Sequence, residues 1–133
     1  MSVIEDRIQL QDVLLRYAAG LDDGDYKMYR SCFCDDVEVS GMGDSPICGI
    51  DAWLSYVRKA MSRYSATQHM LGPQLATISG DKATTRTDLQ ATHYLKEPQG
   101  KTFTLWGTYF TEMVRRDNGW KITRHRLVVR GTK

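Results

Sequence analysis

The second half of the chain alternates in a way that commits it to long β-strands. Small, apolar or threonine side chains, and one histidine, occupy every second position from Ala83 to Leu95, and charged or polar ones fill most positions between them. This period of two is typical of a strand with one buried face. Turns at 97–100 and 117–119 separate this segment from two further predicted strands, 102–116 and 120–129. The sheet they form needs another layer to cover its apolar face.

The first half of the chain predicts helices that can provide this layer. Ser2 and Glu5 have the spacing of a capping box, and the helix they open carries Ile4, Ile8, Leu15 and Ala18 at three- and four-residue steps, which we take as its buried stripe. Asp25 predicts the N-cap of a short second helix, and a third helix should begin near Asp51.

The order of these elements predicts an α+β fold in one domain over residues 1–133. A short strand should lie at 37–40, and an extended segment at 67–79 is interrupted at Gly72-Pro73. We expect this break to curve the antiparallel sheet around the three helices and to leave a pocket between the two layers. The 102–116 strand is apolar on both faces, which indicates a second cover there, such as another subunit.

The composition is that of an ordinary globular protein of 133 residues, with 41% hydrophobic and 26% charged residues and a net charge of +2. The scattered basic residues argue against a nucleic-acid partner. No apolar run is long enough for a membrane span, and the first residues do not resemble a signal peptide. Cys32, Cys34 and Cys48 are an odd number without zinc spacing, so we expect reduced thiols in a cytoplasmic protein.

Asp22 is the first candidate for chemistry. It lies where the first helix should end, and steps of three and four residues place it on the predicted apolar stripe. The negative pole of the helix dipole should make its carboxyl group harder to ionise, which suits a general acid or base. The alternative is that Asp22, Asp23 and Asp25 form an acidic turn.

The histidines are the second set of candidates. His93 falls on the less polar face of its strand and should point inward, where a hydrogen-bonded core role is the simpler interpretation. His69 precedes the Gly72-Pro73 break, and an adjacent aspartate would orient its ring for proton transfer. His125 lies between two arginines and is expected to be exposed.

Two further residues have weaker cases. Tyr17 could donate a hydrogen bond to a substrate oxygen, although a core aromatic role is favoured. Arg130 could bind an anionic or carbonyl oxygen, but arginines near a terminus are often only solvated. Two histidines and a carboxylate can bind iron in principle, but their separation in sequence gives little support for a metal site.

These segments resemble the SnoaL-like branch of the nuclear transport factor 2-like superfamily over nearly the whole chain. The segments that carry the resemblance are 8–25, 33–37, 67–72, 107–109 and 115–122. Within the branch the chain is most similar to scytalone dehydratase, hexachlorocyclohexane dehydrochlorinase and bile-acid 7α-dehydratase. The resemblance implies a cone-shaped α+β barrel, a deep apolar cavity and a homodimer or homotrimer.

The resemblance also implies residue roles. An aspartate–histidine pair that works without metal or organic cofactor matches Asp22 and His69. Tyr17 matches a tyrosine of the bile-acid enzyme, and His93 falls at or beside a second polar residue of these lyases. Tyr109 and Arg130 complete the implied substrate-binding set.

The chain departs from its relatives at two points. Leu21 stands where scytalone dehydratase has a substrate-binding tyrosine, and the lysine near the dehydrochlorinase aspartate is missing. The substrates of those enzymes are therefore not transferred to this chain.

The leading hypothesis is a cofactor-independent, dehydratase-type lyase that acts on a small hydrophobic cyclic molecule, polyketide-, terpenoid- or steroid-like. In this hypothesis His69, oriented by Asp22, removes a proton, and Tyr17 and His93 position the substrate or assist the leaving group. Two alternatives stay open. One is an isomerase in which Asp22 moves a proton between two carbons. The other is a non-catalytic module that binds a ligand or another chain.

Overall fold

The computed structural model describes residues 2–133, which form three helices and six strands. In chain order the elements are α1 (Val3–Asp22), α2 (Tyr26–Ser31), β1 (Phe33–Ser40), β2 (Ile47–Cys48), α3 (Ile50–Met61), β3 (Tyr64–Ser79), β4 (Lys82–Leu95), β5 (Thr102–Arg116) and β6 (Gly119–Thr132).

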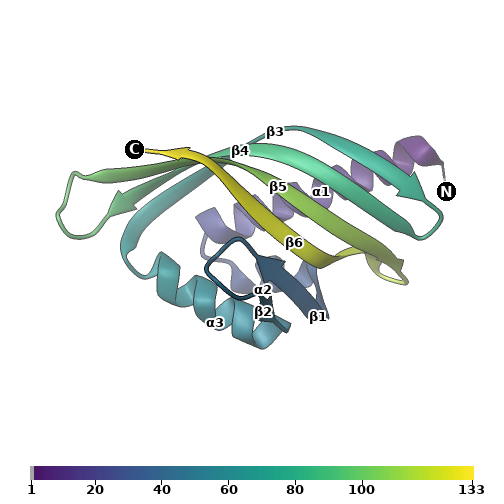
Figure 1. The fold of residues 1–133 in the computed structure, drawn as a ribbon, viewed down its shortest axis with the longest axis horizontal. Coiled ribbons are helices and arrows are strands. Elements are labelled where there is room, and N and C mark those ends of the chain that lie inside the picture. Colours follow the sequence, from purple (N-terminus) through teal and green to yellow (C-terminus); the bar gives the residue numbers. More distant parts are fainter. Residues whose placement is uncertain (1) are drawn as a thin grey trace.

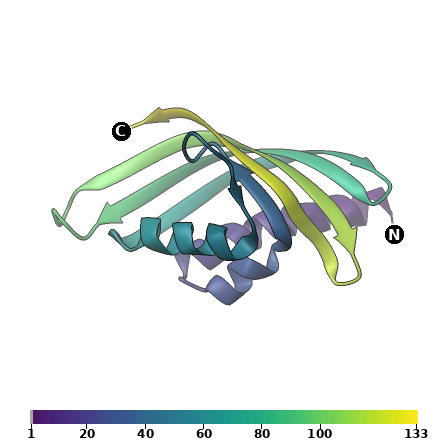
Figure 2. The same ribbon diagram turned by 60° about the horizontal axis from the view of Figure 1, so that its bottom comes forward.

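The six strands form one curved sheet in the order β2-β1-β6-β5-β4-β3. All neighbours are antiparallel except β1 and β6, which run parallel. The sheet arches over the three helices, which lie together against its inner side (Figure 1, Figure 2). This arrangement confirms the predicted α+β fold with a strongly curved sheet packed on three helices. The parallel β1–β6 pair is the one departure from a wholly antiparallel sheet.

Helix α1 begins as predicted but buries a different stripe. The capping box forms, because the Glu5 N–H donates to Ser2 Oγ over 3.2 Å and the Ser2 N–H donates to the Glu5 carboxylate over 2.9 Å. The predicted stripe was wrong at Ile4, Ile8 and Leu15, which are 50–72% exposed.

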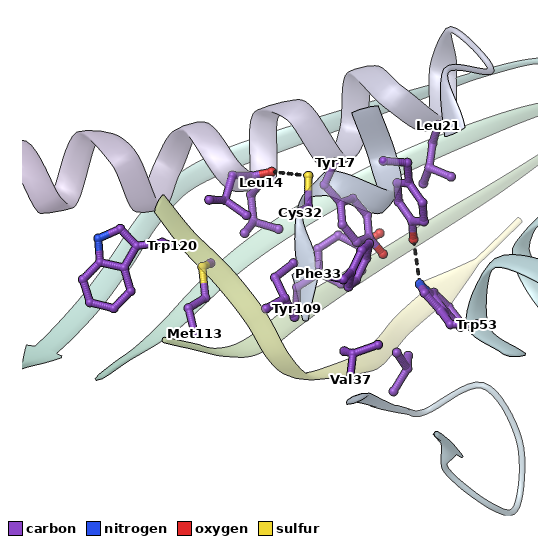
Figure 3. Packing of buried hydrophobic residues seen from close by; sticks show 14 of the residues in the cluster. Leu14, Tyr17, Leu21, Cys32, Phe33, Val37, Trp53, Tyr109, Met113 and Trp120 are labelled. Atoms are coloured by element: carbon purple, nitrogen blue, oxygen red, sulfur yellow. Dashed lines mark hydrogen bonds between the residues drawn. The ribbon is translucent and has the colours of Figure 1, made fainter. Parts of the chain in front are cut away.

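The buried face of α1 instead carries larger side chains, namely Leu10, Val13, Leu14, Tyr17 and Leu21, and it includes Ala18, the one member of the predicted stripe that is buried. Figure 3 shows Leu14, Tyr17 and Leu21 projecting from the helix toward the strands. Two stripes on this helix have similar periodicity, and the one with the bulkier residues faces the sheet because it removes more apolar surface from water.

Several irregularities in strand pairing shape the sheet, and two of them bear on the predictions. The β3–β4 register shifts between Leu71 and Gln74, as the Gly72-Pro73 break predicts. The β5–β6 register shifts where Glu112 pairs with Arg124 and Met113 pairs with Ile122. Such a bulge places an extra residue in one strand and changes which side chains face inward. As a result His125 points into the core and is 1% exposed, so the expectation of an exposed His125 was wrong.

The first turn of α1 is joined to the sheet through a buried carboxylate. Asp6 is 4% exposed and accepts hydrogen bonds from Arg115 over 2.6 and 3.0 Å and from the Trp120 indole over 3.2 Å. Arg115 also contacts Asp81 over 3.0 Å and lies over the Trp120 ring. This cluster joins the start of α1 to the β3–β4 turn and the ends of β5 and β6.

The three cysteines are unpaired in the structure. Cys32 and Cys34 are buried and Cys48 is exposed, all three as free thiols. Burial raises the pKa of the Cys32 thiol to about 11, so this thiol is a poor nucleophile.

On the outer face of the sheet Trp106 is 38% exposed, while Arg86 and Arg126 cover Phe110. A second copy on this face stays a prediction.

Within residues 2–133, no helix combines the length and the apolar character that crossing a membrane requires.

Candidate active site

The end of α1 meets β3 through a carboxylate and an imidazole. Asp22 is the last residue of α1, and its Oδ1 lies 2.7 Å from His69 Nδ1. The other oxygen, Oδ2, accepts a 2.8 Å hydrogen bond from the His69 backbone N–H. The Thr67 hydroxyl donates to Oδ1 over 3.0 Å. Asp22 therefore holds both the ring and the backbone of His69, and β3 supplies all of its hydrogen-bond donors.

These contacts decide the ionisation of Asp22. Burial acts to raise the pKa of its carboxyl group, but the hydrogen bonds and the charge of His69, with the Thr67 hydrogen bond, outweigh burial and hold the pKa below its usual value. The expectation of a carboxyl group that is hard to ionise was therefore wrong. The negative end of the helix dipole is outweighed by three directed donors. Asp22 is an anion that orients His69 rather than a proton donor.

The two ring nitrogens of His69 consequently differ. An ionised carboxylate can only accept, so Nδ1 carries a proton toward Asp22 in the bonded arrangement. In the neutral ring this leaves Nε2 with its lone pair. The His69 side chain is 5% exposed, and it lines an internal cavity that Asp22 itself does not line. His69 can thus act as a base toward a molecule in the cavity while Asp22 stabilises the imidazolium.

The cavity lies between the helices and the inner face of the sheet, with a volume of about 200 Å³. Most of its wall is apolar or aromatic, including Leu21, Trp53, Leu89, Phe103 and Leu105. A cavity of this kind with a few convergent polar groups is the usual form of a small-molecule site. Its position at the end of α1 follows from the sheet curvature, which separates the two layers there.

A second histidine in the cavity has a fixed tautomer. His93 Nδ1 lies 2.9 Å from the Phe103 carbonyl oxygen, which only accepts, so the proton is on Nδ1. Burial lowers the pKa of His93 below its usual value, against the opposing effect of this hydrogen bond. The neutral ring offers Nε2 as a hydrogen-bond acceptor. Its centroid lies 5.9 Å from that of His69.

Three tyrosines form the polar wall deeper in the cavity. Tyr17, Tyr29 and Tyr109 line it, and their hydroxyl groups interact with one another. The Tyr17 ring centroid lies 4.8 Å from that of Tyr29 and 5.3 Å from that of Tyr109. The Trp53 indole N–H donates to the Tyr29 hydroxyl over 3.0 Å, and Figure 3 shows Tyr17 and Tyr109 close together with Trp53 to one side. Burial raises the pKa of all three phenols well above the usual value, so they are neutral hydrogen-bonding groups.

His125 supports this wall from behind. Its Nε2 lies 3.0 Å from the Tyr17 hydroxyl and its Nδ1 lies 2.9 Å from the Thr111 hydroxyl. Burial lowers the pKa of His125 to about 3, so the ring is neutral. Because both nitrogens have partners, His125 fixes the position of the Tyr17 hydroxyl.

The structure thus brings five of the six predicted site residues together and leaves one outside. Asp22, His69, His93, Tyr17 and Tyr109 lie in or beside the cavity. Arg130 is not among the residues that line it. Its Nε donates to the Thr108 hydroxyl over 3.3 Å on the opposite face of the sheet from Tyr109, so it is left out of the candidate site.

Sequence reasoning missed Tyr29 and His125. Tyr29 was visible only as an aromatic residue of a short helix, without a pattern that pointed to a site. His125 required knowledge of the bulge in β6.

Among residues 2–133, no three His, Cys, Asp or Glu side chains are grouped closely enough to bind a metal ion.

Comparisons with known proteins place this geometry in a family. By sequence, no curated protein matches the chain. Many solved structures share its fold, and three of them illustrate the likeness. Kfla4162 from Kribbella flavida is 22% identical, with a TM-score of 0.92 over 99% of this chain and 95% of the other. A protein provisionally named scytalone dehydratase, from Novosphingobium aromaticivorans DSM 12444, is 22% identical, with a TM-score of 0.91 over 98% and 87% of the two chains.

The third structure is hexachlorocyclohexane dehydrochlorinase LinA-type3 from Novosphingobium barchaimii LL02. It is 22% identical, with a TM-score of 0.85 over 98% of this chain and 90% of the other. At these identities the likeness shows the fold alone. A sequence model of the SnoaL-like domain matches residues 2–126, and the chain therefore belongs to the SnoaL-like domain family.

Proposed function

We propose that this protein is a cofactor-independent, dehydratase-type lyase whose base is His69. The observation that carries the proposal is the 2.7 Å contact between Asp22 Oδ1 and His69 Nδ1, with the same imidazole lining an apolar cavity. A positioned base of this kind contributes on the order of 10²–10⁴-fold to a rate. The names of two similar structures, a provisional scytalone dehydratase and a dehydrochlorinase, both describe eliminations and support the same reaction class.

In the proposed step His69 Nε2 takes a proton from a carbon next to a carbonyl or another electron-withdrawing group. The electron pair of the broken C–H bond forms a double bond, and the hydroxyl group on the neighbouring carbon leaves. The imidazolium, stabilised by Asp22, returns its proton to the departing hydroxide, which becomes water. The atoms and charges balance, and His69 ends neutral as it began.

The other polar groups of the cavity have roles that follow from their protonation. The tyrosine hydroxyl groups can donate to the carbonyl oxygen on which negative charge develops. His93, with its proton committed to the Phe103 carbonyl, accepts a hydrogen bond through Nε2. It suits the orientation of a substrate hydroxyl group and not its protonation.

The isomerase alternative gains less support from this geometry. It assigns proton transfer to Asp22, whose two oxygens already accept three hydrogen bonds and whose pKa is lowered. A base with these properties holds a proton poorly, and its carboxylate does not line the cavity. An isomerase would have to use His69 in its place.

The test is a screen of hydroxy-carbonyl compounds in heavy water, with products followed by mass spectrometry. A lyase product lacks the mass of water, an isomer keeps the mass of its substrate, and a binding module gives neither turnover nor deuterium exchange. Asp22→Asn and His69→Gln should lower turnover strongly, by up to about 10²–10⁴-fold for His69→Gln, whereas Asp88→Asn on the outer face of the sheet should not. Near wild-type turnover in His69→Gln would refute the proposal.

A further inference from the structure

A second, more open hollow adjoins the cavity at the same end of the molecule. This outer hollow has a volume of about 600 Å³ and lies where α3 gives way to β3 and where β4 ends. It shares Tyr64 and Phe103 with the cavity, and Arg63 and Lys96 lie on its rim. The two spaces therefore have a common wall.

That wall carries one of the histidines of the site. The His93 ring centroid lies 4.7 Å from that of Tyr64 and 5.3 Å from that of Phe103. A molecule that passes between these aromatic rings contacts His93 on the way. The outer hollow thus adjoins the site at this wall and offers an approach to it.

The approach is basic. The Arg63 guanidinium lies 5.6 Å from the centre of the Tyr64 ring, and the Lys96 N–H donates to the Arg63 carbonyl over 3.0 Å, which holds the two residues side by side. Within residues 2–133, neither cation has a carboxylate in ion-pair range, whereas Arg30, Arg86, Arg115 and Arg124 do. Glu97 is the one acidic residue on this rim, which leaves a net positive charge there.

Size gives the second argument. The cavity of about 200 Å³ is smaller than the roughly 300–1,000 Å³ of typical ligand pockets. A ring system of modest size fills it, and the rest of a larger substrate has to extend outward. The adjoining hollow, beyond Tyr64 and Phe103, offers it room next to Arg63 and Lys96.

We propose that the substrate is amphipathic, with a small ring in the cavity and an anionic group, a carboxylate or a phosphate ester, bound outside it by Arg63 and Lys96. This inference rests on the proposed function, because it assigns the substrate class of the same site. Contacts of this exposed kind contribute modestly to affinity, and they fix which end of the ligand enters first.

The experiment measures binding by isothermal titration calorimetry with matched probes. The charged probe is 2-naphthoate and the neutral one of similar shape is 2-acetylnaphthalene, with 2-naphthyl phosphate as a third. The protein variants are Arg63→Gln/Lys96→Gln and, as a control with the same charge change at the opposite ends of β4 and β5, Lys82→Gln/Arg116→Gln. Circular dichroism checks that each variant is folded.

We expect the Arg63→Gln/Lys96→Gln variant to bind 2-naphthoate about three- to tenfold more weakly than wild type and to bind 2-acetylnaphthalene unchanged. The Lys82→Gln/Arg116→Gln control should bind both probes with the affinity of wild type. Tighter wild-type binding of 2-naphthyl phosphate than of 2-naphthoate would assign a phosphate ester, and the reverse order would assign a carboxylate.

The inference is overturned if wild type binds neither charged probe, or if the Arg63→Gln/Lys96→Gln variant binds 2-naphthoate as wild type does. It is also overturned if the control variant loses as much affinity for 2-naphthoate as the Arg63→Gln/Lys96→Gln variant. Those results do not depend on Asp22. Retained turnover in Asp22→Asn or His69→Gln would instead refute the proposed function, so the two failures can be told apart.

Discussion

Helix α1 carries an aspartate at each end, and each one meets a basic side chain from the sheet. Asp6, in the first turn, accepts two hydrogen bonds from Arg115. Asp22, the last helical residue, accepts from the ring and backbone of His69. Both carboxyl groups have a pKa below the usual value, at one end chiefly through hydrogen bonding to Arg115 and at the other because the His69 contacts outweigh burial.

The difference lies in the partner. The Arg115 guanidinium does not lose its proton, and its donors are used by Asp6, Asp81 and the Gly80 carbonyl. His69 gives one nitrogen to its aspartate and presents the other to a cavity. The same kind of ion pair is thus a structural clamp with arginine and a candidate proton-transfer site with histidine. The helix dipole favours the carboxylate at Asp6 and opposes it at Asp22, so the second pair depends more on its directed donors.

The largest expected effect separates the two pairs by activity. On a substrate from the heavy-water screen, His69→Gln should lower kcat by about 10²–10⁴-fold, because it removes the base. Arg115→Gln should leave kcat within about twofold, measured below its melting temperature, because Arg115 touches no part of the cavity. A similar loss of kcat in both variants would show that the two ends do not differ in role.

The second effect separates them by stability. Arg115→Gln leaves the buried Asp6 carboxylate without its cation, and we expect the Tm to fall by roughly 5–10 °C in a thermal scan. His69→Gln should lower the Tm less, because the Asp22 side chain is 20% exposed and water can replace part of the contact. The reverse order of the two Tm values would contradict the assignment of the clamp.

The lowered pKa values of Asp6 and Asp22 also predict how the free energy of unfolding depends on pH. A carboxyl group with a lowered folded-state pKa contributes stability that is complete above the unfolded value, about 3.8, and is lost as pH falls through the lower folded value. Urea denaturation between about pH 2 and 5 should therefore show a steep loss below pH 4 in the wild type. The loss should be shallower in Asp6→Asn, and an identical curve for that variant would contradict the prediction.

His125 tests a third arrangement, a histidine without a carboxylate. Its folded pKa is about 3, so between the ordinary value of 6.5 and about 3 only the unfolded chain binds the proton. Stability should fall with decreasing pH across this window, with a slope for one site of about 1.4 kcal/mol per pH unit. His125→Gln should remove that slope between pH 6 and 4. If the slope is unchanged, His125 is not buried in its neutral form.

The smallest effect concerns the tyrosine wall. Tyr17→Phe removes one hydroxyl group near the substrate oxygen and one partner of His125. We expect kcat to fall by about three- to tenfold, in line with the loss of one neutral hydrogen bond. Tyr26→Phe, on the outer helix α2, is the matched control and should not change kcat. Unchanged kcat in both variants would remove Tyr17 from the site.

Regular alternation explains which parts of the fold were predictable. The strands at 82–95 and 102–116 match the structure end to end, because the pairing between these two strands is regular throughout. In β6, alternation from Ile122 would have placed Arg124 and Arg126 inward. The bulge shifts the parity, and His125 and Leu127 face the interior in their place. A single extra residue leaves little trace in the sequence and reverses every side chain after it.

The candidate site was predictable only in part for a different reason. Asp22 and His69 are 47 residues apart, and no local pattern reports that α1 ends beside β3. The resemblance to a known family, and not periodicity, predicted that these two residues form a pair. The helix stripe shows the same limit, because α1 has two apolar stripes and only the packing against the sheet selects Leu10, Leu14 and Tyr17 over Ile4 and Ile8.

The most direct test of the central claim is the tautomer of His69, read by ¹⁵N NMR of its ring nitrogens in mildly alkaline solution. We predict a protonated Nδ1 that couples to Asp22 and an unprotonated Nε2, with the preference weakened in Asp22→Asn. A ring protonated on Nε2 in the wild type would leave no base facing the cavity and would contradict the account.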